Sequence, residues 1–402
     1  MGRYAKERAE DQIATLAGRG LDLKAFWDES AEAVSSVIPH MRVPCWFTLD
    51  PASLLVTSHY DHGLIPEFPP EWLAREYYDD DVHDIAAVAR SERGISTLHE
   101  AAGGDPSGSV RWQANMQMGG DQELLVALRT PTGEAWGLLA LYREPGQPPF
   151  EADELEFLRV VAPQLARGAR QALLLGEASE PEGPEPPGLV VLNEDWSIDS
   201  LTPGAERWLC ELSDGDWQAQ NRLPHSVLAV AGRALRTAEG EGLAGEVAVS
   251  RVLSSEGRWM ILHGAALVAG GGGRRVAVIV EPAHPARITP LLMAAYNLTD
   301  REQEVTRLVL CGHSTAQLAE RLSVSPHTVQ QHLKSVFEKT GVRSRRDLVG
   351  KVFFTHYEPR VRDNERRAAQ SRPLRGGPMP PQQNAQNGHN SRADRAEGPS
   401  TL

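Results

Sequence analysis

Residues 298–349 read LTDREQEVTRLVLCGHSTAQLAERLSVSPHTVQQHLKSVFEKTGVRSRRDLV, and this stretch decides the fold of the C-terminal part of the chain. Its apolar residues recur at helical spacing, and a Ser or Thr precedes each block, where its side chain can cap a helix. Thr299 begins the first block with Glu302 three residues on, which is the pattern of a capping box. Gly312 and Gly341 stand where helices should end, because glycine adopts the left-handed conformation without strain. The stretch therefore predicts four short, capped helices.

The second and third of these helices are joined by a turn of three residues, 323–325. Ser314 should cap the second helix and Ser325 the third, with Pro326 at the first helical position, where a missing N–H costs nothing. The small residue Ala319 falls where the two helices should cross. A short turn and a small crossing residue are typical of the helix-turn-helix.

The outward face of the third helix carries side chains that suit DNA. Gln330 and Gln331 can each bond N6 and N7 of adenine as a bidentate pair, which reads base sequence. Lys334 and three nearby arginines suit phosphates, which position a protein without reading sequence. The predicted DNA-contacting residues are Ser314, Ser325, His327, Thr328, Gln330, Gln331, Lys334, Ser335, Arg343, Arg345 and Arg346. From spacing alone, a capped helical bundle that only dimerises or docks is an alternative.

This stretch also resembles the LuxR/GerE helix-turn-helix family. The matching residues are Leu298, Thr299, Arg301, Glu302, Glu304, Val305, Gly312, Ser314, Leu318, Ala319, Ser325, Thr328, Val329, His332, Leu333, Phe337, Lys339, Gly341, Val342, Ser344 and Arg345. The resemblance implies that the third helix enters the major groove and that the fourth forms a dimer contact on DNA. Gln330 stands where the family often has Lys, so the preferred base sequence is left open.

Net charge divides the chain into an acidic and a basic part. The whole chain of 402 residues carries a formal charge of −13 at pH 7. Residues 297–353 and 354–402 each carry +3, so residues 1–296 carry −19. Because an acidic surface repels phosphate, only the C-terminal part should approach nucleic acid.

Length and composition predict two or three domains in the cytoplasm. A chain of 402 residues is long for one core. No apolar run approaches the roughly 18–20 residues that span a bilayer, and the polar N-terminus does not resemble a secretory signal. Cys45, Cys210 and Cys311 are scattered and form neither a disulfide framework nor a CxxC pair. We therefore expect no membrane contact.

The first part of the chain, residues 1–175, predicts a sensor domain. Amphipathic helices lead into short strands, and residues 123–129 and 135–142 form a predicted hairpin with Pro and Gly at its turn. A long helix should follow from Glu151. This pattern resembles a GAF-type domain, in which helices flank an antiparallel sheet and a ligand pocket lies between them.

Residues 69–84 also resemble part of the acyl-homoserine-lactone sensing domains. Those domains surround their ligand with aromatic side chains and an Asp. The resemblance implies Trp72, Tyr77 and Asp84 as ligand-binding residues.

The remaining stretches complete the predicted organisation. Residues 176–188, GEASEPEGPEPPG, are a linker by composition. Residues 189–285 predict two strands, then helices, then three strands. This order resembles a PAS-type domain, a type of domain that senses small molecules or dimerises. We expect a connecting helix at 286–296 and the helix-turn-helix domain at 297–357. Residues 358–402 bury too little apolar surface to offset ordering entropy and are predicted to be disordered.

Two clusters that suggest other chemistry are better explained as structure. The acidic run 79–84, which includes His83, lacks a second cluster of metal ligands and fits a solvated loop or a helix cap. Gly270–Gly273 lacks the Lys-Ser/Thr of a phosphate loop and fits a hairpin turn. The strand and helix alternation of a receiver domain is not evident. We predict no catalytic residue, no metal site and no cofactor.

These observations predict a multidomain α+β protein. It combines GAF-like and PAS-like antiparallel-sheet sensor domains, an all-α four-helix LuxR-type helix-turn-helix domain and a disordered tail. The predicted function is a one-component transcriptional regulator and not an enzyme. We expect a homodimer that binds double-stranded DNA, is biased by a small-molecule effector of unknown identity, and has RNA polymerase as a further partner. The alternatives are an adaptor that does not bind DNA and a GAF-domain enzyme acting on a small molecule. Whether the PAS-like part binds a ligand or only dimerises is left open.

Overall fold

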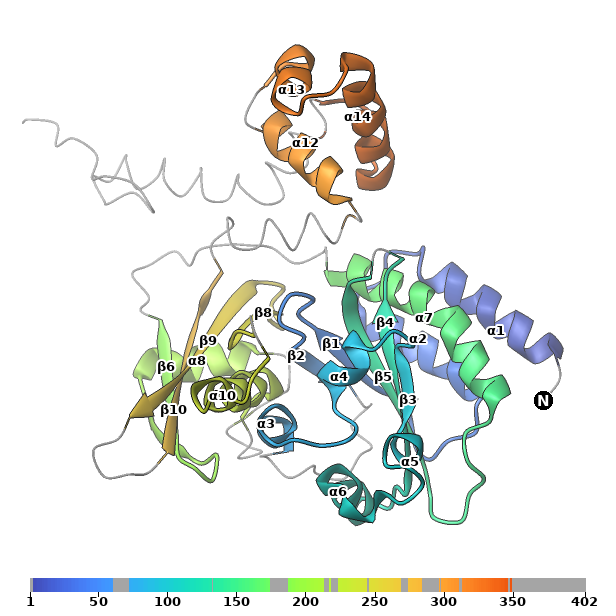
Figure 1. The fold of residues 1–402 in the computed structure, drawn as a ribbon, viewed down its shortest axis with the longest axis vertical. Helices are drawn as coiled ribbons and strands as arrows, with labels where there is room; N and C mark the ends of the chain where they lie inside the picture. The colour runs from blue at the N-terminus through green and yellow to red at the C-terminus, as the bar shows by residue number, and fades with distance from the viewer. Residues whose placement is uncertain are drawn as a thin grey trace, which may run out of the picture. The chain divides into compact units, whose positions relative to one another are not determined.

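The computed structural model describes residues 3–60, 72–131, 133–173, 187–212, 217, 223–243, 246–268, 274–283, 296, 298–310, 313–345 and 348. Over these residues the chain forms two five-stranded antiparallel sheets with helices, and three further helices near the C-terminus (Figure 1). This arrangement confirms the predicted multidomain α+β fold class. No helix in the described part of the chain combines the length and the apolar character that a bilayer span requires.

The first sheet and its helices are built from residues 3–173. In chain order the elements are α1 (Arg3–Leu16), α2 (Leu23–Ser35), β1 (Cys45–Leu49), β2 (Val56–Tyr60), α3 (Trp72–Tyr78), α4 (Ile85–Arg90), β3 (Ile95–Thr97), α5 (Leu98–Ala101), η1 (Pro106–Gly108), α6 (Val110–Gln117), β4 (Gln122–Arg129), β5 (Ala135–Arg143) and α7 (Ala152–Leu173). The strand order is β2-β1-β5-β4-β3. The predicted hairpin is confirmed as β4 and β5, in which Glu123 pairs with Tyr142.

Different helices pack on the two faces of this sheet. Because successive side chains of a strand point to opposite faces, neighbouring residues of one strand belong to different apolar clusters. Trp46, Leu124 and Leu141 lie in an apolar cluster with residues of α1, α2 and α7. Within that cluster the rings of Trp27 and Trp46 stack with centroids 4.6 Å apart. Their strand neighbours on the other face pack with residues of α3 and α4. Figure 1 shows α1, α2 and α7 together on one side of the sheet.

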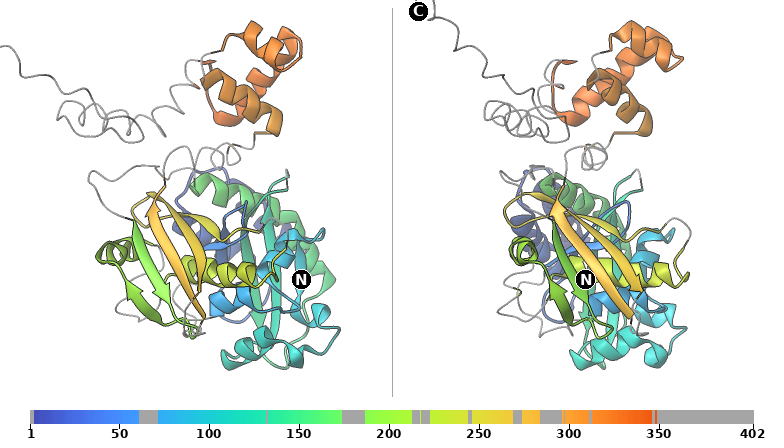
Figure 2. Two further views of the ribbon diagram at one scale, coloured as in Figure 1. Left: turned by 60° about the vertical axis from the view of Figure 1, so that its left-hand side comes forward. Right: turned by 90° about the vertical axis from the view of Figure 1, so that its left-hand side faces the viewer.

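The second sheet is built from residues 188–282. Its elements are β6 (Gly188–Leu192), β7 (Ile198–Leu201), α8 (Pro203–Glu211), α10 (His225–Ala238), β8 (Val249–Leu253), β9 (Trp259–Val268) and β10 (Arg274–Pro282). The strand order is β7-β6-β10-β9-β8, and Figure 2 shows the sheet from two further directions. α10 packs on β9 at Gly264, where a Cβ would lie 2.8 Å from the carbonyl oxygen of Val230. The two strands, helices and three strands follow the predicted order.

Helices α3 and α10 join the two sheets. A Cβ at Gly232 of α10 would lie 2.0 Å from the carbonyl oxygen of Ala74, so only glycine permits this approach to α3. Asp50, which is buried, accepts hydrogen bonds from the backbone N–H and Nε of Arg251 at 2.9 and 2.8 Å. Buried residues of both sheets belong to one continuous apolar cluster. The two sheets therefore share a core, which the sequence pattern did not predict.

The C-terminal helices are α12 (Asp300–Leu310), α13 (Thr315–Arg321) and α14 (Pro326–Thr340), and they confirm the first three predicted helices. Their core consists of Leu298, Val305, Val309, Leu318, Ala319, Leu322, Val329, Leu333, Val336 and Leu348. The predicted fourth helix lies largely outside the described residues, but the Leu348 N–H donates to the Ser344 carbonyl at 2.9 Å, as in a helical turn. Most of the predicted linker 176–188 and connecting helix 286–296, and all of the tail 358–402, lie outside the described residues.

Candidate DNA-binding face and ligand cavity

Hydrogen bonds fix where α13 and α14 begin. The Ser314 hydroxyl accepts from the Gln317 backbone N–H at 3.3 Å, while the Gln317 side chain accepts from the Ser314 N–H at 2.8 Å. This reciprocal pair is a capping box. The Ser325 hydroxyl accepts from the Thr328 N–H at 3.1 Å and lies 2.8 Å from the Thr328 hydroxyl. Two of the predicted DNA-contacting residues, Ser314 and Ser325, are therefore also the caps that set the helix starts.

The turn between the two helices is tight. Ser323 has a φ of 52°, in the left-handed region that non-glycine residues rarely occupy. The Val324 N–H donates to the Ala319 carbonyl at 3.0 Å, which closes the end of α13. Ala319 is buried, as expected of a small residue where two helices cross. The predicted helix-turn-helix geometry is present.

The outer face of α14 is polar and open to solvent. His327, Gln330, Gln331 and Lys334 are exposed, whereas the apolar stripe of the same helix is buried. The Gln331 Nε2 lies 3.2 Å from the His327 Nε2, and the Lys334 Nζ lies 3.9 Å from Glu338. Such exposed contacts are worth little free energy and can be exchanged for contacts with a partner. These four predicted residues are therefore open to solvent.

Ser335 has a different environment from the exposed face. Its hydroxyl donates to Glu302 Oε1 at 2.6 Å, and the Lys339 ammonium donates to Glu302 Oε2 at 2.6 Å. Burial would raise the pKa of the Glu302 carboxyl, but the hydrogen bonds from Lys339, Ser335 and the Thr299 N–H hold it below its usual value. In this structure Ser335 connects α14 to α12.

The predicted arginine cluster is described in part. Arg343 is exposed. Arg345 is half-buried, and its Nη2 has no hydrogen-bond partner among the described residues. Arg346 lies outside the described residues. The geometry places one of these three arginines on an open surface.

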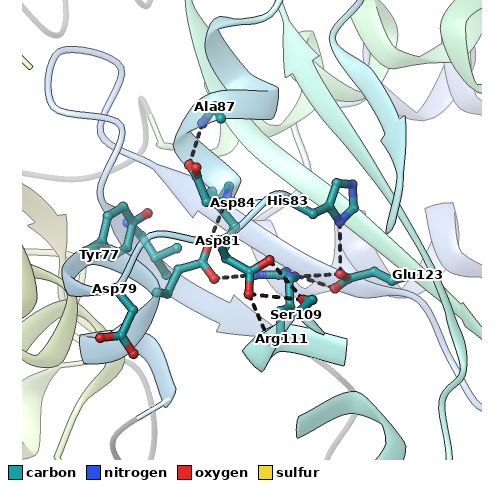
Figure 3. Close-up of polar contacts among 12 residues, drawn as sticks. Tyr77, Asp79, Asp81, His83, Asp84, Ala87, Ser109, Arg111 and Glu123 are labelled. Atoms are coloured by element: carbon teal, nitrogen blue, oxygen red, sulfur yellow. Dashed lines mark hydrogen bonds and ion pairs between the residues drawn. The ribbon is translucent and has the colours of Figure 1, made fainter. Parts of the chain in front are cut away.

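A cavity of about 210 Å³ lies beside the first sheet, between α3 and α6. Its lining residues are Trp72, Arg75, Glu76, Asp79, Asp81, Val110, Arg111, Gln113, Ala114 and Gln117. Of the three predicted ligand-binding residues, only Trp72 is among them. Tyr77 donates to the Leu54 carbonyl at 2.8 Å and accepts from the Val56 N–H at 3.0 Å, which ties α3 to the sheet. Asp84 caps α4 by accepting from the Ala87 N–H at 2.6 Å, so the acidic run supplies a helix cap (Figure 3).

A buried ionic cluster adjoins this cavity, and two of its members, Glu76 and Arg111, line it. The Arg111 Nε and Nη2 donate to the two oxygens of Glu123 at 2.5 and 2.8 Å, and its Nη1 donates to Glu76. The His83 Nδ1 lies 3.2 Å from Glu123, and its Nε2 lies 3.1 Å from the Ser96 carbonyl oxygen. Figure 3 shows Arg111 and His83 converging on Glu123. The guanidinium also lies over the Trp72 ring, 5.1 Å from its centroid.

Asp81 fixes the start of α6 beside this cluster. Its carboxylate accepts from the Ser109 hydroxyl at 2.9 Å and from the Arg111 N–H at 3.1 Å. Ser109 in turn caps α6 by accepting from the Trp112 N–H at 3.0 Å. These contacts hold Arg111 at the first turn of the helix, where it reaches the two carboxylates.

The two carboxylates of the cluster titrate in opposite directions. Burial, reinforced by Asp84 and Glu123 and opposed by Arg111, raises the pKa of Glu76 to about 8. Burial also opposes ionisation of Glu123, but Arg111 and His83 lower its pKa to about 2. Arg111 therefore serves mainly as the partner of the ionised Glu123 carboxylate. Glu76 also contacts Arg111, but its burial favours the neutral form of its carboxyl.

Sequence reasoning did not identify Arg111, Glu76 or Glu123. They come from α6, α3 and β4, and no spacing relates them. One local signal existed: Glu123 is a charged residue directly before the apolar run LLVAL of β4, and it is buried like that run. A charge in that place must find a buried partner, but the sequence does not say which one.

Comparison with known proteins assigns two segments. Residues 296–352 match the family described as bacterial regulatory proteins, luxR family, and residues 26–168 match the GAF domain family. A Mycobacterium tuberculosis protein named as an HTH-type transcriptional regulator is 51% identical over 53 residues, which are 13% of this chain and 6% of that protein. The HTH-type transcriptional regulator MalT of Klebsiella pneumoniae is 36% identical over 66 residues, 16% of this chain and 7% of that protein. The chain thus matches only a small fraction of either relative.

Solved structures give weaker similarities. The phycoerythrobilin-bound GAF domain of a cyanobacterial phytochrome has a TM-score of 0.31 at 15% identity, and the match covers 43% of this chain and 98% of that domain. The VqmA–ligand–DNA complex of Vibrio cholera has a TM-score of 0.21 at 12% identity, covering 42% of this chain and 83% of that one. From the family matches, this chain contains a GAF domain and, near its C-terminus, a LuxR-family helix-turn-helix domain.

Proposed function

We propose that this protein is a sequence-specific DNA-binding transcriptional regulator whose N-terminal part senses a small molecule or partner. The observation that carries the proposal is the exposed face of α14, where glutamine, histidine and lysine side chains stand opposite the buried residues Val329, Leu333 and Val336. Within a luxR-family segment, this is the face that a major groove would meet. The +3 charge of residues 297–353 favours approach to phosphate.

Each exposed residue has a proposed role on DNA. Gln330 and Gln331 would bond base edges, and Lys334 would bond phosphate, with Arg343 and Arg346 as further phosphate contacts. The proposed active form is a homodimer, because the luxR-type fourth helix would pair two copies on DNA. RNA polymerase is the further partner that a regulator of transcription would address. A cytoplasmic location follows from this role.

The sensing role is proposed for residues 1–175, with a PAS-like second domain at 189–285. The GAF match and the cavity between α3 and α6 support the first part. The strand order of the second sheet and the packing of its helix α10 against α3 support a PAS-like domain that receives the signal. An effector can act only by binding the DNA-competent arrangement more tightly than the other one. The chain is proposed to be a regulator without catalytic residues of its own.

Selection from a random DNA library by the full-length protein tests DNA binding. We expect enrichment of one motif, arranged as an inverted repeat if the protein binds as a dimer. Gln330→Ala should change the preferred bases, with a loss of about 1–3 kcal/mol on the original site. Glu338→Ala on the same helix is the matched control for base preference: it removes no predicted base contact, so the preferred bases should stay the same. A library that remains unenriched, with a folded protein, contradicts the proposal.

A further inference from the structure

Two buried carboxylates beside the cavity share one guanidinium. In the Arg111 cluster, which comprises Arg111, Glu76, Glu123 and His83, Arg111 donates from Nε and Nη2 to Glu123 at 2.5 and 2.8 Å and from Nη1 to Glu76. His83 also approaches Glu123, with its Nδ1 3.2 Å from Oε2. The side chains of Glu76 and Glu123 are 5% and 0% exposed. Glu123 therefore has the larger share of the positive charge, and Glu76 has the smaller.

The environment of Glu76 reflects this deficit. Its Oε1 accepts from the Ile85 N–H at 2.6 Å, which is an uncharged donor. Burial raises the pKa of Glu76 to about 8, and although Arg111 opposes this shift, Asp84 and Glu123 reinforce it. Because a nearby positive charge favours the ionised form of a carboxyl, a further cation beside Glu76 would be stabilised there.

The same face of α3 brings a second carboxylate to the cavity. Trp72, Glu76 and Asp79 stand at positions i, i+4 and i+7, which share one side of a helix, and all three line the cavity. The helical turn reaches Asp79, whose N–H donates to the Arg75 carbonyl at 2.8 Å. The Asp79 carboxylate is 30% exposed and accepts from Arg75 Nε at 2.9 Å. Since the Arg75 side chain is 51% exposed, this ion pair is weak and can be exchanged for another cation.

The opposite wall adds a third carboxylate and apolar surface. Asp81 accepts from the Ser109 hydroxyl at 2.9 Å and from the Arg111 N–H at 3.1 Å, and both donors are uncharged (Figure 3). Val110 and Ala114 of α6 also line the cavity. Val110 is 41% exposed, so the cavity opens to solvent on this side.

The cavity has room for a small organic molecule without rearrangement. Its volume of about 210 Å³ lies below the roughly 300–1,000 Å³ of sites for drug-sized ligands, so it suits a molecule of fewer atoms. Arg75 and Arg111, the two arginines among the described lining residues, are each bonded to a carboxylate. An anionic ligand would therefore meet surplus negative charge, whereas a cation would meet carboxylates that lack a full countercharge.

We propose that this cavity binds a small primary amine in its protonated form, with the ammonium group among Glu76, Asp79 and Asp81 and an apolar body against Trp72 and Val110. An ammonium group has three N–H donors and no acceptor, which matches a lining of carboxylate acceptors. Hydrogen bonds with ionised partners are roughly twice as strong as those between neutral groups, so the charge of the ligand decides the preference. That this amine is the effector rests on the proposed regulatory function.

Calorimetric titration of the full-length protein with benzylamine at neutral pH tests the site. Benzyl alcohol is the matched neutral probe, since it keeps the ring and a donor but lacks the charge, and benzoate carries the opposite charge. We expect benzylamine to bind, benzyl alcohol to bind at least about tenfold more weakly, and benzoate to give no heat of binding. This comparison uses only the unaltered protein.

Variants assign the preference for the amine to the carboxylates. Glu76→Gln should weaken benzylamine binding at least about tenfold, and Asp79→Asn should have a smaller effect because its carboxylate is partly exposed. Benzyl alcohol binding should change little in either variant. Asp80→Asn is the matched control: it makes the same change in charge at a neighbouring side chain that is 81% exposed and is not among the described lining residues. It should leave the affinity for benzylamine unchanged.

A larger side chain at Ala114 tests whether the binding is in the cavity. Ala114 is half-buried on α6 and lines the cavity, so Ala114→Leu should occupy part of its volume. Benzylamine and benzyl alcohol should then both bind more weakly, in contrast to the carboxylate variants. Ala114 and Asp79 are both partly exposed, so these two variants test the site even if Glu76→Gln does not fold.

Three results would overturn the site: no heat of binding with benzylamine up to about 10 mM, a weak-fragment range; equal affinity for benzylamine and benzyl alcohol; or full benzylamine affinity in both Asp79→Asn and Ala114→Leu. A mobility-shift assay on the same preparations separates these outcomes from the regulatory function. Absence of DNA binding with intact benzylamine binding would contradict the proposed function and leave the site standing. DNA binding that is indifferent to bound benzylamine would contradict the effector role alone.

Discussion

The outer face of α14 and the Arg111 cluster beside the first sheet both gather polar side chains, but in opposite environments. Gln330, Gln331 and Lys334 are exposed on α14. The side chains of Arg111 and Glu123 are 2% and 0% exposed. Exposed polar groups bond to water until a partner replaces it, whereas buried ones must be paired within the fold. The first surface is therefore free to bind from outside, and the second is committed to internal bonds.

Removing the central cation of the buried cluster should have the largest effect. Arg111→Met leaves Glu123 ionised and without its main partner in the core, so the free energy of unfolding should fall by about 3–5 kcal/mol. Urea denaturation at neutral pH measures this loss. Arg159→Ala, which breaks an exposed pair with Glu156, is the control and should cost less than about 1 kcal/mol. Equal losses for the two variants would contradict the assigned difference between buried and exposed pairs.

The Glu76 carboxyl should make stability fall as the pH rises. Its pKa is about 8 in the folded protein and 4.5 without the fold, so the folded state binds the proton more tightly. The resulting stabilisation is complete below pH 4.5 and is lost as the pH rises through 8. Glu123, with a folded pKa of about 2, has the opposite sign: its contribution is present above pH 4.5 and is lost as the pH falls through 2.

Glu76→Gln should reduce the fall in stability that the Glu76 carboxyl causes as the pH rises. Between pH 5 and pH 8 the variant should lose at least about 1 kcal/mol less stability than the unaltered protein, which corresponds to one pKa unit. Urea midpoints at the two pH values provide the measurement. Parallel curves for the two proteins would show that Glu76 does not titrate in this range.

Loss of the α14 cap should have an intermediate effect. Ser325→Ala removes the side-chain acceptor of the Thr328 N–H, and the helix-turn-helix should lose about 1 kcal/mol of stability. Hydrogen exchange of the first-turn amides of α14 reports this loss locally. Ser325→Asp retains an acceptor and should restore protection, and its failure to do so would indicate another role for the hydroxyl.

The smallest effect on stability is expected at Lys334. Its side chain is 80% exposed and contacts Glu338 only at 3.9 Å, so Lys334→Ala should change the free energy of unfolding by less than about 0.5 kcal/mol. DNA affinity should nevertheless fall on all sequences, with the salt slope reduced by about one, as for one phosphate contact. If Lys334→Ala lowered the stability of the protein and left its DNA affinity unchanged, Lys334 would belong with the internally bonded residues and not with the DNA-binding surface.

The sequence predicted the helix-turn-helix well because its signals are local. Caps, turn residues and apolar spacing all lie within a few residues of the elements they define, as Ser314, Ser325 and Gly341 illustrate. The hairpin of β4 and β5 was predictable for the same reason. The three predicted ligand-binding residues have different positions: Trp72 lines a cavity, whereas Tyr77 and Asp84 fasten α3 and α4, and their role in ligand binding stays a prediction. A resemblance in residue types does not say which way each side chain points.

The amino-acid sequence alone determined the order of the helices and strands and the polar outer face of α14. Helical and strand periods are properties of neighbouring residues, so they can be recognised without the tertiary structure. Only the tertiary structure decided that Arg111 meets Glu76 and Glu123, that Gly232 lies against Ala74, and that the buried side chain of Asn115 has no hydrogen-bond partner among the residues described. Those contacts join residues between 12 and 158 positions apart, and the burial of a polar group depends on everything packed around it.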